Sequence, residues 1–272
     1  TARETNVANS LAGRVAGLVV KGTSSGPGGT SKITLRGLPS ISGTGSPLYV
    51  IKGILMDNTK RGSAGQLVGA DAGDGMGNLS PDDIESMTVL NGHAASLLYG
   101  SRASNGVILI TTKTGSKGGD WSLTYTMNVM AENPVDFTDF QEVYGQGVGG
   151  QKPTTATDAQ TSGRLAWGAM MDGSSVIGYD GNQYPYSPSN DRYINFYRTG
   201  TNFTNTVSIS KGLGSDGSFR MSASNLDAKS IVPNSGVDRL TLNLNVEQNI
   251  TDKFNVTAMI NYIDQKSTNV PN

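Results

Sequence analysis

The stretch LLYGSRASNGVILITT, residues Leu97–Thr112, decides the fold. It follows a lead-in of small, helix-compatible residues that begins at Gly92. Gly100 permits a tight change of direction, and Gly106 releases the chain into the apolar, β-branched run Val107–Thr112. A continuous run of this kind predicts a strand that is buried on both faces. We therefore expect Val107–Thr112 to be the central strand of a sheet.

The residues before this stretch predict further strands and a short helix. Asn6 is a suitable helix cap, and apolar residues at helical spacing follow it before a strand near Leu18–Lys21. Alternating side chains predict a strand over Ser31–Leu38. The apolar run Pro47–Met56 predicts another strand, kinked at Gly53.

A second helix start precedes the central strand. Ser80 is a suitable N-cap, the proline after it suits the first helical position, and Asp82 and Asp83 suit the positive end of a helix dipole. We expect one helical turn here, followed by a strand over Ser86–Leu90. Residues 1–115 thus read as a small α+β domain with about four strands and two short helices.

Two glycine-rich loops interrupt this domain. Gly22–Thr30 superficially resembles a phosphate-binding loop, but it lacks Gly-Lys-Ser/Thr at a helix start, so we expect a plain turn. Asp57–Asn78 is also rich in glycine, and it contains Asp71 and Asp74. Because the ligand spacing of a calcium-binding EF-hand is missing, we expect a solvated, mobile loop and no metal.

The composition excludes several function classes. The chain has 272 residues, 36 Gly, no Cys and a formal net charge of -1. It therefore offers no disulfide, no thiolate site and no basic footprint for nucleic acid. The single histidine, His93, lies at a predicted helix start, where solvent exposure is expected and no triad is assembled. We expect neither an enzyme nor a bound metal or cofactor.

Targeting and membrane-spanning signals are also missing from the sequence. No run of about 18 apolar residues exists, so no transmembrane helix is expected. Thr1 begins without Met, a basic region or an apolar signal core, so the chain reads as an internal or processed piece.

The second half of the chain has a different pattern. Apolar residues alternate with Thr, Asn and Ser in five segments, each with one uncharged apolar face. The segments are Trp121–Val129, Asn202–Gly212, Ser218–Leu226, Val237–Gln248 and Phe254–Ile263. This pattern predicts strands of a membrane β-barrel whose apolar face meets lipid.

The connections between these segments follow the outer-membrane pattern. The first, residues 131–201, is long, Leu213–Gly217 and Asn249–Lys253 are short, and Asp227–Gly236 is intermediate. Short periplasmic turns and long outside loops are typical of such barrels. Because the smallest closed membrane barrels have about eight strands, we expect further strands on the natural polypeptide.

Most of the tyrosines lie in the long connection. Phe137–Val143 predicts a short helix within it. Aromatic side chains with polar neighbours suit sugar or peptide binding, but they suit loop packing and an interfacial girdle as well. Packing is the favoured interpretation.

Three phrases of the chain resemble one family. Tyr99–Gly115, YGSRASNGVILITTKTG, resembles the end of the plug domain of TonB-dependent outer-membrane transporters, in particular the SusC/RagA-like nutrient importers. Leu11–Val20 is similar to the opening of such plugs, and Pro81–Leu90 is similar to the turn before their closing strands. Lys52 stands where the family carries Asp, so a role for that acid does not transfer.

The resemblance implies an α+β plug domain over 1–117. It also implies that the plug is followed, over 118–272, by the N-terminal part of an antiparallel, 22-stranded transmembrane β-barrel. This part would contain a long extracellular loop at 131–201. It implies import of oligosaccharides or peptides across the bacterial outer membrane, with the plug gating the lumen. It also implies a SusD-like surface lipoprotein as lid, and energy from the TonB complex through a segment not in this chain. Membrane lipid would surround the barrel.

Two sets of residues are singled out. Candidates that face substrate are Asp57, Asn58, Arg61, Asp71, Asp74, Tyr184 and Tyr186. Residues that the resemblance assigns to the structural motif of the plug are Arg36, Gly37, Tyr49, Gly53, Tyr99, Gly100, Arg102, Asn105 and Gly106.

Two other functions remain open from sequence alone. A soluble, secreted binding or adhesion module would pack its apolar strand faces in a β-sandwich, and a monomer stable without detergent would favour it. A surface enzyme acting on polysaccharide would need converging carboxylates, which the sequence does not show.

Overall fold

The structure, a computed structural model, describes residues 5–22, 26–35, 37, 45–59, 71, 73–115, 119–163, 165–189, 193–214, 216–251 and 253–269. The chain forms two compact units, one of Thr1–Asn133 with Arg198–Asn272 and one of Pro134–Tyr197. Within the described ranges, no helix is both long and apolar enough to span a membrane.

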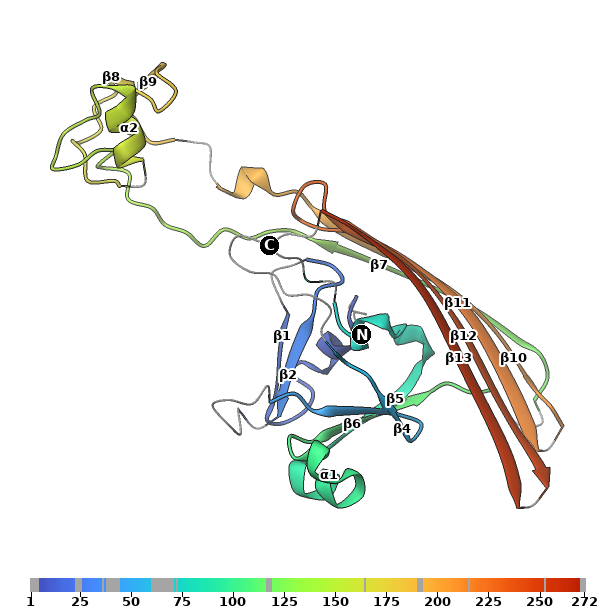
Figure 1. Cartoon of the computed structure of the whole chain (residues 1–272). Helices are drawn as coiled ribbons and strands as arrows, with labels where there is room; N and C mark the ends of the chain where they lie inside the picture. Colours follow the sequence, from blue (N-terminus) through green and yellow to red (C-terminus); the bar gives the residue numbers. More distant parts are fainter. Residues whose placement is uncertain are drawn as a thin grey trace. The chain divides into compact units, whose positions relative to one another are not determined.

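Two small sheets build the N-terminal domain of the first unit (Figure 1). The first is the antiparallel pair β1 (Leu18–Gly22) and β2 (Ser31–Leu35). The second has the order β4-β3-β6-β5, with β3 (Leu48–Ile51), β4 (Ile54–Met56), β5 (Ile84–Leu90) and β6 (Val107–Thr112). β6 pairs parallel with β3 and antiparallel with β5, so the prediction of an inner strand is confirmed.

Short helices connect these strands. They are the 3-10 helices η1 (Val7–Leu11), η2 (Met76–Asn78), η3 (Pro81–Asp83) and η4 (Ser101–Ala103), and the α-helix α1 (Gly92–Tyr99). Asn6 caps η1 as predicted, because its side chain accepts a hydrogen bond from the Ala8 amide. Ser80 precedes η3 but makes no side-chain cap bond, and β5 begins two residues before the predicted strand.

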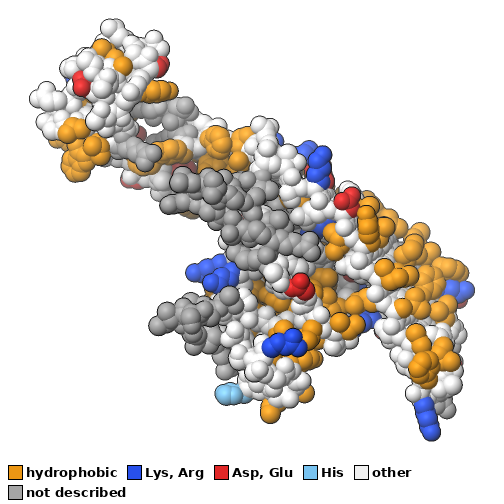
Figure 2. Space-filling model, viewed as in Figure 1, with side chains coloured by type: hydrophobic (Ala, Val, Ile, Leu, Met, Phe, Trp, Pro, Cys, Tyr) orange, Lys and Arg blue, Asp and Glu red, His pale blue; other side chains and the backbone are white. Residues whose placement is uncertain are grey.

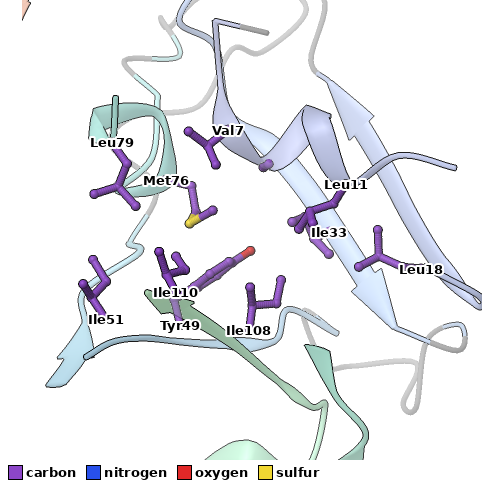
Figure 3. Close-up of a cluster of buried hydrophobic side chains, with 11 residues drawn as sticks. Val7, Leu11, Leu18, Ile33, Tyr49, Ile51, Met76, Leu79, Ile108 and Ile110 are labelled. Carbon is purple, nitrogen blue, oxygen red and sulfur yellow. The ribbon is translucent and has the colours of Figure 1, made fainter. Parts of the chain in front are cut away.

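Both faces of β6 are covered by apolar side chains. On one face, Ile108 and Ile110 join a cluster that spans η1, both sheets and η2 (Figure 3). On the other face, Val107 packs with Val50, Ala95 and Ala103 beneath α1 and η4. The prediction of a strand buried on both faces is confirmed.

The predicted single strand Pro47–Met56 was wrong, because the chain turns back inside it. Lys52 has a φ of 46° and Gly53 a φ of 84°, and the chain then pairs antiparallel with itself as β3 and β4. Two successive residues with positive φ are typical of a type I′ hairpin turn. Pro47–Met56 therefore supplies two strands of the sheet.

Replacing Gly106 with Ala is expected to destabilise the N-terminal domain by about 2 kcal/mol. Its φ is +95°, and an added Cβ would lie 2.5 Å from Leu35 Cδ1 and 2.9 Å from the Leu90 carbonyl oxygen. Thermal unfolding of the purified whole polypeptide measures the loss. Gly22→Ala is the matched control, since a Cβ there meets nothing within 4 Å. Equal losses in both variants would contradict this explanation.

Five long strands form the second part of the first unit, which we call the wall sheet (Figure 1). They are β7 (Ser122–Glu132), β10 (Gly200–Gly212), β11 (Gly217–Lys229), β12 (Gly236–Thr251) and β13 (Phe254–Thr268). All pair antiparallel in the order β13-β12-β11-β10-β7, so the described strands form an open sheet, not a closed barrel. The strands are longer than predicted, and the connection between β11 and β12 shrinks to residues 230–235.

The two faces of the wall sheet differ in chemistry. The buried inner face is polar, as Thr241, Asn243 and Asn245 of β12 show, while Leu240 and Leu242 between them are exposed. Figure 2 shows hydrophobic side chains gathered over these strands. The exposed apolar residues of the outer face include Trp121, Leu123, Tyr125, Met127, Val129, Phe203, Val207, Met221, Leu240, Leu242, Ile260 and Tyr262.

This arrangement contradicts the β-sandwich alternative. A sandwich would bury the apolar face of each sheet against a second sheet. In the residues that the structure describes, the wall sheet instead buries its polar face and leaves the apolar one open. That inversion is typical of a strand wall whose outer surface meets lipid.

The second unit has little regular structure. It contains α2 (Ala156–Ser162), β8 (Ser175–Ile177), β9 (Gln183–Pro185) and the 3-10 helix η5 (Tyr193–Phe196). The predicted helix over Phe137–Val143 was wrong. The Gln141 side chain there accepts hydrogen bonds from the amides of Val143 and Tyr144, which fixes a non-helical turn.

Candidate functional site between the N-terminal domain and the wall sheet

The N-terminal domain touches the inner face of the wall sheet through a buried ion pair. Arg220 Nη1 on β11 donates to Asp83 Oδ1 at 2.7 Å, and Ser222 Oγ donates to the same oxygen at 2.6 Å. The two charged side chains are only 7% and 5% exposed. Next to this pair, Thr206 Oγ1 on β10 donates to Asp82 Oδ2 at 2.5 Å. We call Asp82, Asp83, Thr206, Arg220 and Ser222 the latch.

Local structure fixes how the two aspartates are presented. η3 is a single turn and β5 begins directly after it at Ile84. Asp82 and Asp83 therefore lie in the short turn that leads into β5. The helix dipole alone, which the sequence predicts as the role of both carboxylates, is an incomplete explanation, because both also bond to the wall. Arg220 is the one charged residue among the serines of the inner face of β11. In the sequence, that isolated charge on an otherwise uncharged face was the feature that could have predicted a buried acidic partner.

A second contact lies on β12. The guanidinium of Arg239, which is buried, donates to the carbonyl oxygens of Gly77 and Thr5. Asn202 of β10 also reaches Thr5, donating from Nδ2 to its hydroxyl at 3.0 Å. The wall sheet thus holds the N-terminal domain at two segments that are far apart in sequence, near residue 5 and near residue 77.

A third contact explains the charge of Lys52. Its Nζ lies 2.8 Å from Glu247 Oε1 of β12, with the two side chains 14% and 27% exposed. Nearby, Asn245 Nδ2 donates to the Lys113 carbonyl oxygen at 3.2 Å. The lysine in the β3–β4 turn therefore matches a carboxylate on the wall.

Exchanging the charges of this pair tests the match. Lys52→Asp is expected to weaken the contact by roughly 1–2 kcal/mol, because two carboxylates then face each other. The double variant Lys52→Asp with Glu247→Lys restores opposite charges and should recover most of the loss. Thermal unfolding of the purified whole polypeptide gives the coupling between the two positions. Additive losses in the double variant would show that the pair does not interact.

Two spaces lie between the N-terminal domain and the wall sheet. The smaller, of about 10 Å³, is lined by Thr5, Ser80, Asp82 and Arg239 among others. The larger, of about 300 Å³, is an open recess in which the hydroxyls of Thr124, Thr126, Thr206, Ser208 and Ser210 face Asp82, Glu85, Lys113 and Arg220. The contact is therefore polar and open to water along part of its length.

The structure places Asp71 and Asp74 inside the N-terminal domain. Asp71 accepts hydrogen bonds from Thr30 Oγ1 at 2.5 Å and from the Gly73 amide at 3.0 Å. Asp74 accepts from Asn6 Nδ2 at 3.2 Å. Both are 4% exposed, so the prediction that they lie in a solvated loop was wrong. Their carboxylates bond to other residues of the domain and so serve its internal structure.

The other predicted substrate-facing residues are scattered. Asp57 is exposed, and Asn58 Oδ1 accepts from the Met76 amide at 2.8 Å. In the second unit, Tyr184 is exposed and donates to Asp180, which raises the pKa of the Tyr184 hydroxyl. Tyr186 is buried, with its hydroxyl 2.9 Å from the Gln146 carbonyl oxygen, so it serves packing. Arg61 lies outside the described residues.

The residues of the predicted plug motif occupy turns and core positions. Tyr49 lies in the core, and burial raises the pKa of its hydroxyl. Tyr99, the last residue of α1, is partly buried against the cluster that contains Val107, and Asn105 Nδ2 donates to the Ser46 carbonyl oxygen at 3.4 Å. Arg102 is exposed, and Arg36 lies outside the described residues. The motif glycines with positive φ are Gly37, Gly53, Gly100 and Gly106.

Catalytic and metal-binding sites need several polar side chains that converge on one point. His93 is exposed on α1, as expected. In the described part of the chain, no three or more His, Asp or Glu side chains are grouped to hold a metal ion.

Comparisons with known proteins agree with this architecture. Residues 1–107 match the TonB-dependent receptor plug domain family. The chain is 31% identical to the TonB-dependent receptor SusC of Bacteroides thetaiotaomicron over 93% of its own length and 22% of that protein. The chain belongs to the SusC-like TonB-dependent receptors. It is also 29% identical to the TonB-dependent receptor P26 of Formosa agariphila, over 96% of this chain and 24% of the relative.

Solved structures show the same fold. The RagAB peptide importer in its closed-closed state matches 98% of this chain and 30% of that chain, with a TM-score of 0.66 and 19% identity. Its open-open state matches with a TM-score of 0.63 and 20% identity. The N-terminal domain is therefore the plug, and the wall sheet is part of an unclosed barrel of the SusC/RagA kind.

The chain matches only part of the length of its relatives. It spans about a quarter of the length of the curated relatives it matches. TonB-dependent receptors of this family are outer-membrane proteins, and the exposed apolar face of the wall sheet suits that location.

Proposed function

We propose that the chain is the plug and first wall strands of a transporter that imports oligosaccharides or peptides across the outer membrane. Similarity to SusC and to a solved peptide importer supports this class of function. The observation that carries the proposal is the latch, a buried ion pair between plug and wall set in a polar interface. Such a contact holds the plug in one place and still separates without exposing apolar surface.

The proposed cycle has two partners. The TonB complex supplies a pull from the periplasmic side, acting through a segment not in this chain. A SusD-like surface lipoprotein closes the outer side over the cargo. The pull breaks the latch and moves part of the plug, and the polar inner face of the wall, with Thr206 and Asn243 among its buried groups, then lines the path.

We infer that the role is transport and not catalysis. The buried carboxylates of the plug accept hydrogen bonds from plug and wall donors, as Asp83 does from Arg220 and Asp71 from Thr30. Groups used in this way hold structure and are poor general acids or bases. The boundary between plug and barrel near residue 117, and an extracellular place for residues 131–201, stay predictions.

A cross-link between plug and wall tests the proposal. The chain contains no Cys, so Asp82→Cys with Thr206→Cys would introduce a single disulfide across the interface. In cells that carry the whole transporter, oxidation should abolish uptake of labelled oligosaccharides or peptides, and reduction should restore it.

A matched control separates gating from general damage. Leu123→Cys with Ile209→Cys joins two neighbouring wall strands at a paired position on the outer face and leaves the plug untouched. This variant should import normally when oxidised. Undiminished uptake by the oxidised variant with Asp82→Cys and Thr206→Cys would contradict the proposal. The panel of labelled cargoes in the same assay decides between glycans and peptides.

A further inference from the structure

Arg239 holds the plug in a way that the latch does not. It is a buried cation, and no carboxylate of the described residues lies within ion-pair distance of it. It donates instead to two main-chain carbonyls, Gly77 O and Thr5 O, the second at 3.1 Å. One wall side chain therefore ties together two plug segments that are far apart in sequence.

Asn6, the residue after Thr5, bonds to the interior of the plug and not to the wall. Asn6 Nδ2 donates to Asp74 Oδ1 inside the plug at 3.2 Å, and the Gly77 amide donates to the same oxygen at 2.9 Å. Asn6 Oδ1 also accepts from the Ala8 amide at 3.0 Å and so caps η1. Two consecutive residues thus bond to the wall and to the plug interior.

We propose that Thr5, Asn6, Asp74, Gly77 and Arg239 form a clasp that carries displacement of the N-terminal segment into the interior of the plug. Moving Thr5 off the wall removes a carbonyl from the buried Arg239 charge and draws Asn6 away from the buried Asp74 charge. Because Thr5 and Asn6 are consecutive residues, one displacement of the chain breaks both contacts. The bonds from the Ser31 and Gly77 amides to Asp74 are weakened in turn.

The clasp also controls access of water to the latch. Thr5 lines the small cavity together with Ser80, Asp82 and Arg239. The Ser80 hydroxyl is buried there with no hydrogen-bond partner in the described residues. Removing Thr5 opens this space to water beside the Asp82–Thr206 bond and raises the local dielectric, which weakens the neighbouring ion pair. The clasp therefore opens before the latch.

If the clasp opens before the latch, the plug is released from the wall in two steps. This inference rests on the proposed function only for the source of the pull. A displacement at residue 5 first loosens the plug interior at Asp74. The hydrated latch, with Asp83 and Arg220, then gives way. Neither step needs a group outside the described residues other than water.

Hydrogen exchange on the purified whole transporter tests the coupling without cargo or TonB. Arg239→Met removes the wall side of the clasp, and Asn6→Ala removes the plug side. In each variant, amides of both residues 5–8 and residues 73–77 should exchange roughly tenfold faster, as should the amides of Thr30 and Ser31 that bond to Asp71 and Asp74. The double variant should exchange no faster than the single ones, since either change opens the whole clasp.

Two controls make the test decisive. Arg239→Lys keeps the charge but has a single donor group, so it should give an intermediate effect if the Met variant does not assemble. Arg220→Met should speed exchange near Asp83 while leaving residues 5–8 protected. Faster exchange confined to residues 5–8, or additive effects in the double variant, would overturn the clasp. Import can still stand in that case, because the disulfide assay tests it separately.

Discussion

The Arg220→Met variant is expected to lose about 3–5 kcal/mol of the free energy that holds the plug against the wall. The substitution leaves the Asp83 carboxylate buried without its cation, while Ser222 supplies only one neutral hydrogen bond. Denaturant unfolding of the detergent-purified whole transporter measures the loss. Limited proteolysis should show that the plug is cleaved at lower protease concentrations.

A double variant separates the ion pair from packing at the same site. Arg220→Met together with Asp83→Leu removes both charges and should recover much of the stability, because no charge then stays buried alone. The difference between double and single losses is the coupling energy of the latch. A single loss below about 1 kcal/mol with additive behaviour would mean that the latch does not hold the plug.

The Leu242→Arg variant is expected to impair membrane assembly by about 2–4 kcal/mol. Leu242 is exposed on the outer face of the wall sheet, paired with Ala223 on one side and Tyr262 on the other. A charge at the middle of this apolar band would have to enter lipid. The fraction folded in bilayers, measured by the gel shift between folded and heated protein, gives the effect.

A charge at the end of the same strand is the matched control. Asp238 lies on the same face of β12 near its start, outside the apolar band. Asp238→Arg should cost no more than about 1 kcal/mol, because the cost of a charge falls toward the membrane surface. Equal effects at positions 238 and 242 would show that Leu242 does not face lipid.

Local patterns in the sequence predicted the strands well. The alternation in Val237–Gln248 assigned Leu240 and Leu242 to one face and Thr241 and Asn243 to the other, and the structure has this register. The β3–β4 hairpin was missed because its turn, Lys52-Gly53, is flanked on both sides by apolar residues, so Gly53 was interpreted as a kink within one strand. Lysine is uncommon at positive φ, so the pair did not match the Asn-Gly or Asp-Gly pattern of a two-residue hairpin turn.

The contacts of the site depend on long-range packing that local patterns do not contain. Asp74 lies in a glycine-rich loop without apolar periodicity, so its burial beneath Asn6 had no local signal. Asp83 fitted a helix start equally well with or without Arg220 across from it. The predicted helix at Phe137–Val143 failed for a similar reason, since a single Gln141 side chain determines the turn.

The polar inner face of the wall sheet has a consequence for biogenesis. A sheet with one apolar face and one polar face can orient itself at a bilayer without contacts from the plug. A barrel that has lost its plug would remain an aqueous pore, since hydroxyls and amides such as those of Thr241 and Asn243 need only water in its place.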